Sequence, residues 1–175
     1  MDNRLSYKDD SDRCYGATGA AIGIVVFDGE DYIDHIHIDA PADSMIEFVP
    51  GFYFGGNPRI SAKTAWNRML QSYNLQVVST LANVLCRTLV NEGMPVRYEV
   101  KQRLHEVVSE EGRDTCSLED DEIERIFKKN YDYLMRVFSN RGVQEVAREM
   151  ASELRTRRRM SRLEIIEQLR ALSMI

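Results

Sequence analysis

The sequence predicts a mostly helical α+β protein, in which a small N-terminal antiparallel β-meander is followed by a bundle of about five helices. Short β-branched or alternating runs are confined to the first third of the chain, and apolar residues recur every three or four positions over the rest. We therefore expect a flexible polar N-terminus over 1–19, the meander and an aromatic loop over 20–58, and the helical bundle over 59–175. Residues 20–175 are expected to form one compact domain.

Three short strands make up the predicted meander. The first, Ile22–Phe27, is an apolar β-branched run, and the Asp-Gly pair that follows it favours a hairpin turn. The second, Tyr32–Asp39, alternates polar and apolar residues from His35 onward, as expected of a strand with one face in water. The third, Met45–Val49, is expected to pair as another antiparallel strand.

Five amphipathic helices are predicted in the remainder of the chain. Ser61 suits the N-cap of the first, whose apolar stripe from Trp66 to Leu89 predicts one face buried over about 30 residues. The stripes of the other four span Val96–Val108, Ile123–Phe138, Val143–Leu154 and Leu163–Leu172. Ser117 begins a pattern that resembles a capping box, and Ser161 suits the N-cap of the last helix.

Composition narrows the class of protein. The 175 residues are 43 % hydrophobic and 29 % charged with a net charge of −5, which is typical of a soluble globular protein and not of bulk nucleic-acid binding. The first residues have no signal-peptide pattern, and the apolar run Ala20–Phe27 is too short for a membrane span. Three widely spaced cysteines without a CxxC pair indicate reduced thiols, so we expect a cytoplasmic protein that needs no cofactor.

A His-x-His-x-Asp pattern in the second predicted strand is the first candidate site. His35, His37 and Asp39 would point to one side of the strand, because alternate residues of a strand share a face. Two imidazoles and a carboxylate are a sensible ligand set for zinc or non-haem iron. The more common role for such residues is the solvent face of an edge strand.

An arginine-rich segment between the last two predicted helices is the second candidate. Its five arginines are Arg155, Arg157, Arg158, Arg159 and Arg162. They suit contacts with nucleic-acid phosphates, although the helix that follows carries outward glutamates that would repel DNA. The interpretation that we favour is an inter-helix linker that pairs with the acidic stretch Glu119–Glu124 of the same chain or of a neighbour.

An aromatic triplet, Phe52, Tyr53 and Phe54, lies in the loop Pro50–Pro58 and is the third candidate. An exposed triplet would be an interface, and a folded-back triplet would be a satellite core. A small sheet with open edges also favours pairing with a second copy.

No catalytic motif emerges from the sequence. The glycines at 16, 19 and 23 resemble a dinucleotide-binding loop, but a polar segment precedes them and a predicted strand, not a helix, follows. We expect a non-enzymatic interaction or scaffold protein that forms a homodimer through its N-terminal sheet and aromatic loop and binds a further protein partner. The alternatives are a nucleic-acid-associated protein that uses the arginine-rich segment and a metal-dependent enzyme at the His-x-His-x-Asp pattern.

Overall fold

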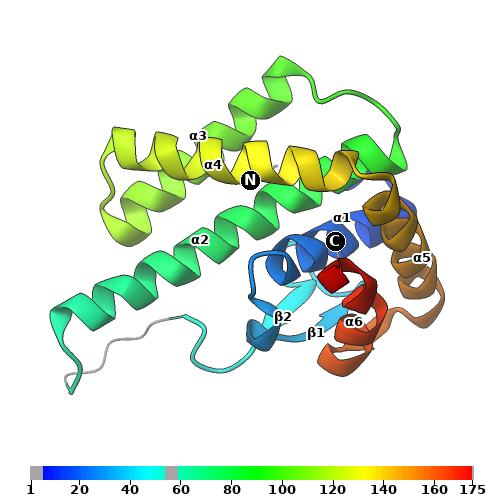
Figure 1. Ribbon diagram of the computed structural model, residues 1–175, viewed down its shortest axis with the longest axis horizontal. Coiled ribbons are helices and arrows are strands. Elements are labelled where there is room, and N and C mark those ends of the chain that lie inside the picture. The colour runs from blue at the N-terminus through cyan, green and yellow to red at the C-terminus, as the bar shows by residue number, and fades with distance from the viewer. Residues whose placement is uncertain (1–5, 54–58, 175) are drawn as a thin grey trace.

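A computed structural model describes residues 6–53 and 59–174 of the chain (Figure 1). It confirms the mostly helical α+β class. The α-helices are α1 (Asp10–Val25), α2 (Ala62–Cys86), α3 (Tyr98–Cys116), α4 (Asp120–Ser139), α5 (Arg141–Arg157) and α6 (Arg162–Leu169). The strands are β1 (Ile33–His37), β2 (Ile46–Phe48) and β3 (Arg159–Ser161), and a π-helical turn, η2 (Arg87–Asn91), extends α2. Two short 3-10 turns occupy Glu30–Tyr32 and Arg170–Met174.

Helix α1 occupies a part of the chain for which the sequence predicts a flexible segment and a strand. The strand predicted over Ile22–Phe27 is wrong, since most of it forms the end of this helix, and the segment 10–19, expected to be flexible, forms its beginning. Eleven of the sixteen residues of α1 are buried, because α2, α5, α6 and β2 all pack against it. A helix covered on every side lacks a polar face, so its apolar run resembles that of a buried strand.

The glycines of α1 explain how closely it approaches α2. A Cβ atom at Gly19 would lie 2.3 Å from Cβ of Cys86 and 2.4 Å from the carbonyl oxygen of Ala82. At Gly23 it would lie 2.5 Å from Cβ of Ala82. The glycines that resemble a dinucleotide-binding loop therefore allow close packing between two helices.

The sheet is assembled from both ends of the chain. Its strand order is β2-β1-β3, and both pairings are antiparallel. The second and third predicted strands are confirmed as β1 and β2, but the third partner is β3, which lies between α5 and α6. Strand β1 is consequently the middle strand and not an edge.

Helices α2 to α6 match the five predicted helices. In the core, the Tyr73 hydroxyl donates to the Val108 carbonyl at 2.9 Å and thereby joins α2 to α3. The predicted cap at Ser161 is confirmed as a capping box with Glu164, whereas α4 is capped by Glu119 and begins later than the Ser117 pattern predicts. No helix in the described ranges has both the length and the apolar character to cross a membrane.

A buried ion pair fixes the start of α1 to η2. The Arg87 guanidinium donates to both carboxylate oxygens of Asp12, whose side chain is 2 % exposed. Burial by itself would raise the pKa of Asp12, but hydrogen bonds from Arg87 and from the Lys8 amide outweigh it and hold that pKa below its usual 3.8. All three cysteines are free and buried, and burial raises the pKa of the Cys14 thiol to about 11.

Candidate interaction surface

The aromatic triplet is mostly folded inward. Phe52 is 3 % exposed and stacks on Phe48 with ring centroids 4.0 Å apart, and its carbonyl accepts a hydrogen bond of 2.7 Å from Ser72 in α2. Tyr53, by contrast, is 64 % exposed. Phe54 lies outside the described residues. The segment is therefore a satellite core around Phe52 that leaves Tyr53 accessible.

The residues of the His-x-His-x-Asp pattern are placed on and just after the middle strand of the sheet. His35 Nδ1 lies 2.7 Å from Asp34 and its Nε2 lies 3.4 Å from Glu47, whereas His37 Nε2 lies 3.9 Å from Asp39. Within residues 6–53 and 59–174, no group of three or more His, Cys, Asp or Glu side chains is positioned to hold a metal ion.

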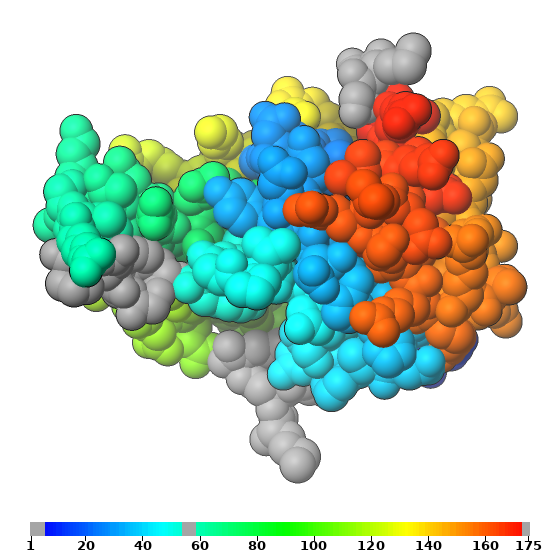
Figure 2. All heavy atoms as spheres, turned by 90° about the horizontal axis from the view of Figure 1, so that it is seen from below, coloured from blue at the N-terminus to red at the C-terminus, as the bar shows by residue number. Residues whose placement is uncertain are grey.

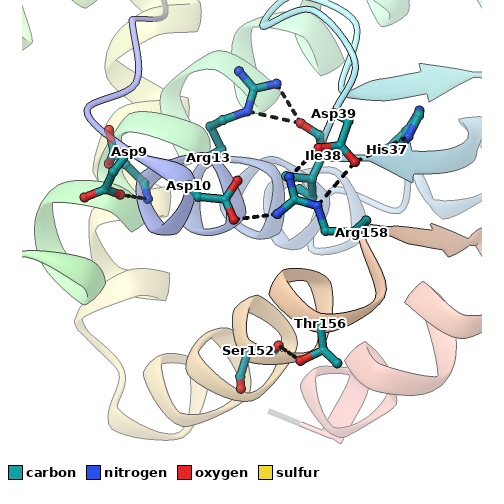
Figure 3. A network of polar contacts seen from close by, with 10 residues as sticks. Asp9, Asp10, Arg13, His37, Ile38, Asp39, Ser152, Thr156 and Arg158 are labelled. Carbon is teal, nitrogen blue, oxygen red and sulfur yellow. Dashed lines mark hydrogen bonds and ion pairs between the residues drawn. The ribbon is translucent and has the colours of Figure 1, made fainter.

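Asp39 belongs to a different cluster, which is centred on Arg158 (Figure 3). The Arg158 guanidinium donates to both carboxylate oxygens of Asp39 and to Asp10 at the start of α1. These hydrogen bonds lower the pKa of both carboxyl groups. Beside them, Arg13 donates to the carbonyls of Ile38 and Ala40. The cluster holds the end of α5 and the start of β3 against α1 and the segment after β1.

The arginine-rich segment is thus partly used within the chain. Arg157 pairs with Glu153 at 2.9 Å and with Glu164 at 2.6 Å. The partners of Arg157 and Arg158 are not in the acidic stretch 119–124, so the predicted intrachain pairing with that stretch is wrong for these two arginines. Arg155, Arg159 and Arg162 are exposed.

The first three turns of α2 form a surface that the sequence did not predict. These turns reach the end of the molecule opposite α5 and α6 (Figure 2, teal), and most of their side chains are exposed. Trp66 is 40 % exposed, although it begins the stripe that was predicted to be buried. Full burial of the stripe starts only at Tyr73.

Charge is segregated around this surface. Between 59 and 91 the sequence has four basic residues and no Asp or Glu, and Lys63 and Arg68 are exposed beside Trp66. The end of α3 and the start of α4, at the same end of the molecule in Figure 1, carry nine carboxylates and one arginine between 106 and 124. A basic helix end and an acidic corner, which we define as residues 106–124, therefore lie at one end of the fold.

A shallow groove lies between α2 and the start of α4, beside the acidic corner. It has a volume of about 300 Å³, and its apolar side chains are Leu70 of α2, Leu118 of the α3–α4 connection and Ile126 of α4. Glu122, Arg125 and Lys129 border it. The uneven charge along the chain is the sequence signal that could have revealed this surface, because apolar spacing alone does not tell a buried helix face from an unpartnered one.

No protein-family model matches the chain, and comparisons with curated proteins and with solved structures found no similar protein.

Proposed function

We propose that this chain is an interaction protein that forms a homodimer through the start of α2. The proposal rests on Trp66, which is 40 % exposed at the start of α2, where most side chains of the helix are not covered by the rest of the protein. Tryptophan is one of the residue types enriched among energetically dominant interface residues. A second copy of the chain offers the apolar groove of Leu70, Leu118 and Ile126 to receive that indole ring.

Charge complementarity supports a second copy as the occupant. In a two-fold arrangement, the same patch of both copies meets, so each basic helix end faces the acidic corner of the other. Lys63 and Arg68 would then approach Asp120 and Asp121, all four of which are exposed. Such pairs contribute orientation and association rate more than affinity, which the buried indole supplies.

The edges of the sheet offer less to a second copy. Strands β2 and β3 are three residues each, and short edge strands present few unpaired backbone groups. Phe52, one of the residues expected at an interface, is already buried within the chain. We therefore propose that self-association uses the start of α2. Pairing through the sheet is the alternative that the experiment below distinguishes.

Sedimentation velocity over a range of protein concentrations tests the proposal. We expect a species of twice the 20.2 kDa chain mass that dissociates on dilution, and we expect Trp66→Ala to weaken the dimer at least about tenfold. Leu163→Ala is the matched control, because Leu163 is 76 % exposed on α6, away from this surface. A monomer at every concentration, or a dimer that Trp66→Ala leaves unchanged, contradicts the proposal, and in the latter case the sheet becomes the better interface.

Charge exchange tests the orientation of the two copies. Lys63→Glu with Arg68→Glu in one variant, and Asp120→Lys with Asp121→Lys in another, should each weaken self-association. A mixture of the two variants should restore dimers, because each altered surface then meets its complement. Failure of the mixture to associate would exclude this arrangement. Nucleic acid that co-sediments with the wild-type protein at low salt would favour the alternative of a nucleic-acid-associated protein.

Trp66 also provides a direct probe, since it is the only tryptophan in the chain. Its fluorescence emission should move to longer wavelength as the dimer dissociates and the indole returns to water. An emission maximum that does not change with concentration, while the mass does, would place the interface elsewhere.

A further inference from the structure

A crevice between α1, β2 and α2 has a volume of about 300 Å³, which is at the lower end of the range for small-molecule sites. Residues of the β1–β2 connection and Tyr53 also line it. On the side of α1 the lining residues are Ala17 and Ala20, whose small side chains leave the space open. Trp66 and the groove that is proposed to receive it are not part of this lining.

The α2 side of the crevice is polar. Gln76, Ser79 and Thr80 line it at the i, i+3, i+4 spacing of one helix face, whereas Val77 and Val78 between them are buried. The three polar side chains are half-buried, and they make no hydrogen bond within the described part of the chain. A half-buried polar stripe without partners indicates a surface that faces a polar molecule.

The hydroxyl groups of this stripe are not used by the helix itself. A hydroxyl within a helix often donates to the carbonyl four residues earlier, as those of Ser139 and Thr156 do in α4 and α5. Among the described contacts, Ser79 and Thr80 make no such bond. Their oxygens and the Gln76 amide are not among the partnerless side-chain atoms that are shielded from solvent, so a molecule in the crevice can reach them.

The charge of the lining disfavours an anion. No Lys, Arg or His is among the described residues that line the crevice. Asp43 is exposed and makes no ion pair within the described ranges, whereas Glu111, the other carboxylate of the lining, already interacts within the chain. The two oxygens of the Asp43 carboxylate can accept from two neighbouring hydroxyl groups, but a phosphate or carboxylate ligand would meet no cation.

An aromatic ring completes the lining. Tyr53 is 64 % exposed, and its ring packs edge-to-face against Phe52 with centroids 4.9 Å apart. Phe52 is in turn stacked on Phe48, which also lines the crevice. These contacts hold the Tyr53 ring in place while most of its surface stays open, so it offers a fixed apolar surface to the C–H groups of a ligand.

We infer that the crevice binds a neutral pyranose sugar. Such a sugar has C–H groups on the faces of its ring and hydroxyl groups around it that both donate and accept hydrogen bonds. The C–H groups would contact Tyr53, and the hydroxyl groups would exchange hydrogen bonds with Gln76, Ser79 and Thr80. Two neighbouring hydroxyl groups would donate to Asp43. The site does not depend on self-association of the chain.

Two-dimensional amide NMR of the full chain during titration tests the sugar and the charge requirement. The probes are the methyl glycosides of glucose, galactose and mannose, and the matching uronates, which carry the same rings with one carboxylate. We expect at least one glycoside to shift the crevice resonances saturably at millimolar concentration, and its uronate to bind more weakly. If no glycoside shifts these resonances, or if the uronate binds as tightly as its glycoside, the inference is overturned.

Matched variants locate the site. Tyr53→Ala and Gln76→Ala should each weaken glycoside binding about fivefold, the typical effect of losing one apolar contact or one hydrogen bond. Tyr98→Ala and Gln102→Ala remove the same side chains from exposed positions of α3 that do not line the crevice, and they should leave binding unchanged. Equal effects of a variant and its control would refute the site.

Thr80→Val tests the polar stripe with the least change in shape, because it replaces only the hydroxyl group by a methyl group. We expect weaker glycoside binding and an unchanged circular dichroism spectrum, which shows that the fold is intact. Binding that stays at the wild-type level in Thr80→Val, Gln76→Ala and Tyr53→Ala would place the sugar elsewhere and contradict the inference.

Discussion

Gly19→Ala is expected to destabilise the protein by about 2 kcal/mol. The new methyl group would lie 2.3 Å from Cβ of Cys86 and 2.4 Å from the carbonyl oxygen of Ala82, both well inside contact distance. Because the second contact is with backbone, a side-chain rotation cannot relieve it, and α1 must move away from α2. Overpacking in a core costs about 1–3 kcal/mol, and two simultaneous contacts place Gly19→Ala near the upper end of that range. The higher helix propensity of alanine offsets about 1 kcal/mol of this cost, which leaves the net loss of about 2 kcal/mol.

Urea unfolding followed by circular dichroism measures the effect, and thermal unfolding should show a midpoint about 4–8 °C lower. Gly93→Ala is the control, because a Cβ there meets nothing within 4 Å and its cost is limited to the positive φ of 64°. If residue 19 belonged to a flexible segment before a strand, Gly19→Ala would be neutral or slightly stabilising. That result would refute the close packing of α1 on α2.

Arg87→Met leaves the Asp12 carboxylate buried without its partner, and we expect a loss of about 3 kcal/mol at neutral pH. Because the pKa of Asp12 is depressed in the native protein, the stability that its carboxylate contributes is present above pH 3.8 and is lost as the pH falls. Arg87→Met raises the pKa of Asp12, so the difference in unfolding free energy between variant and wild type should shrink on acidification. A difference that urea unfolding shows to be independent of pH would contradict the pairing. The thiols of Cys14, Cys86 and Cys116 should react with a thiol reagent only after unfolding, because all three are buried and burial raises their pKa; rapid reaction of native protein would contradict that burial.

Much of the helical part of the fold could be predicted from the sequence. The stripes of α3 to α6 have one apolar and one polar face, so their period identifies them without knowledge of what they pack against. The capping box of Ser161 and Glu164 is equally local, since all its atoms lie within one helical turn.

The candidate sites were less predictable because each depends on distant residues. Asp39 could be placed next to His37 from the sequence, but its partnership with Arg158 joins positions 119 apart. Likewise, Phe52 is buried because Phe48 and α2 cover it, and Tyr53, one residue later, is left exposed.

The apolar periodicity after residue 61 predicts which segments are helical and which side of each is apolar. Contacts between distant segments make α1 a buried helix, add β3 to the sheet and leave Trp66 exposed. Periodicity in a sequence reflects only the contrast between the two faces of one segment. A helix buried on all sides has no such contrast, and whether an apolar face is covered depends on neighbours that are far away in the chain.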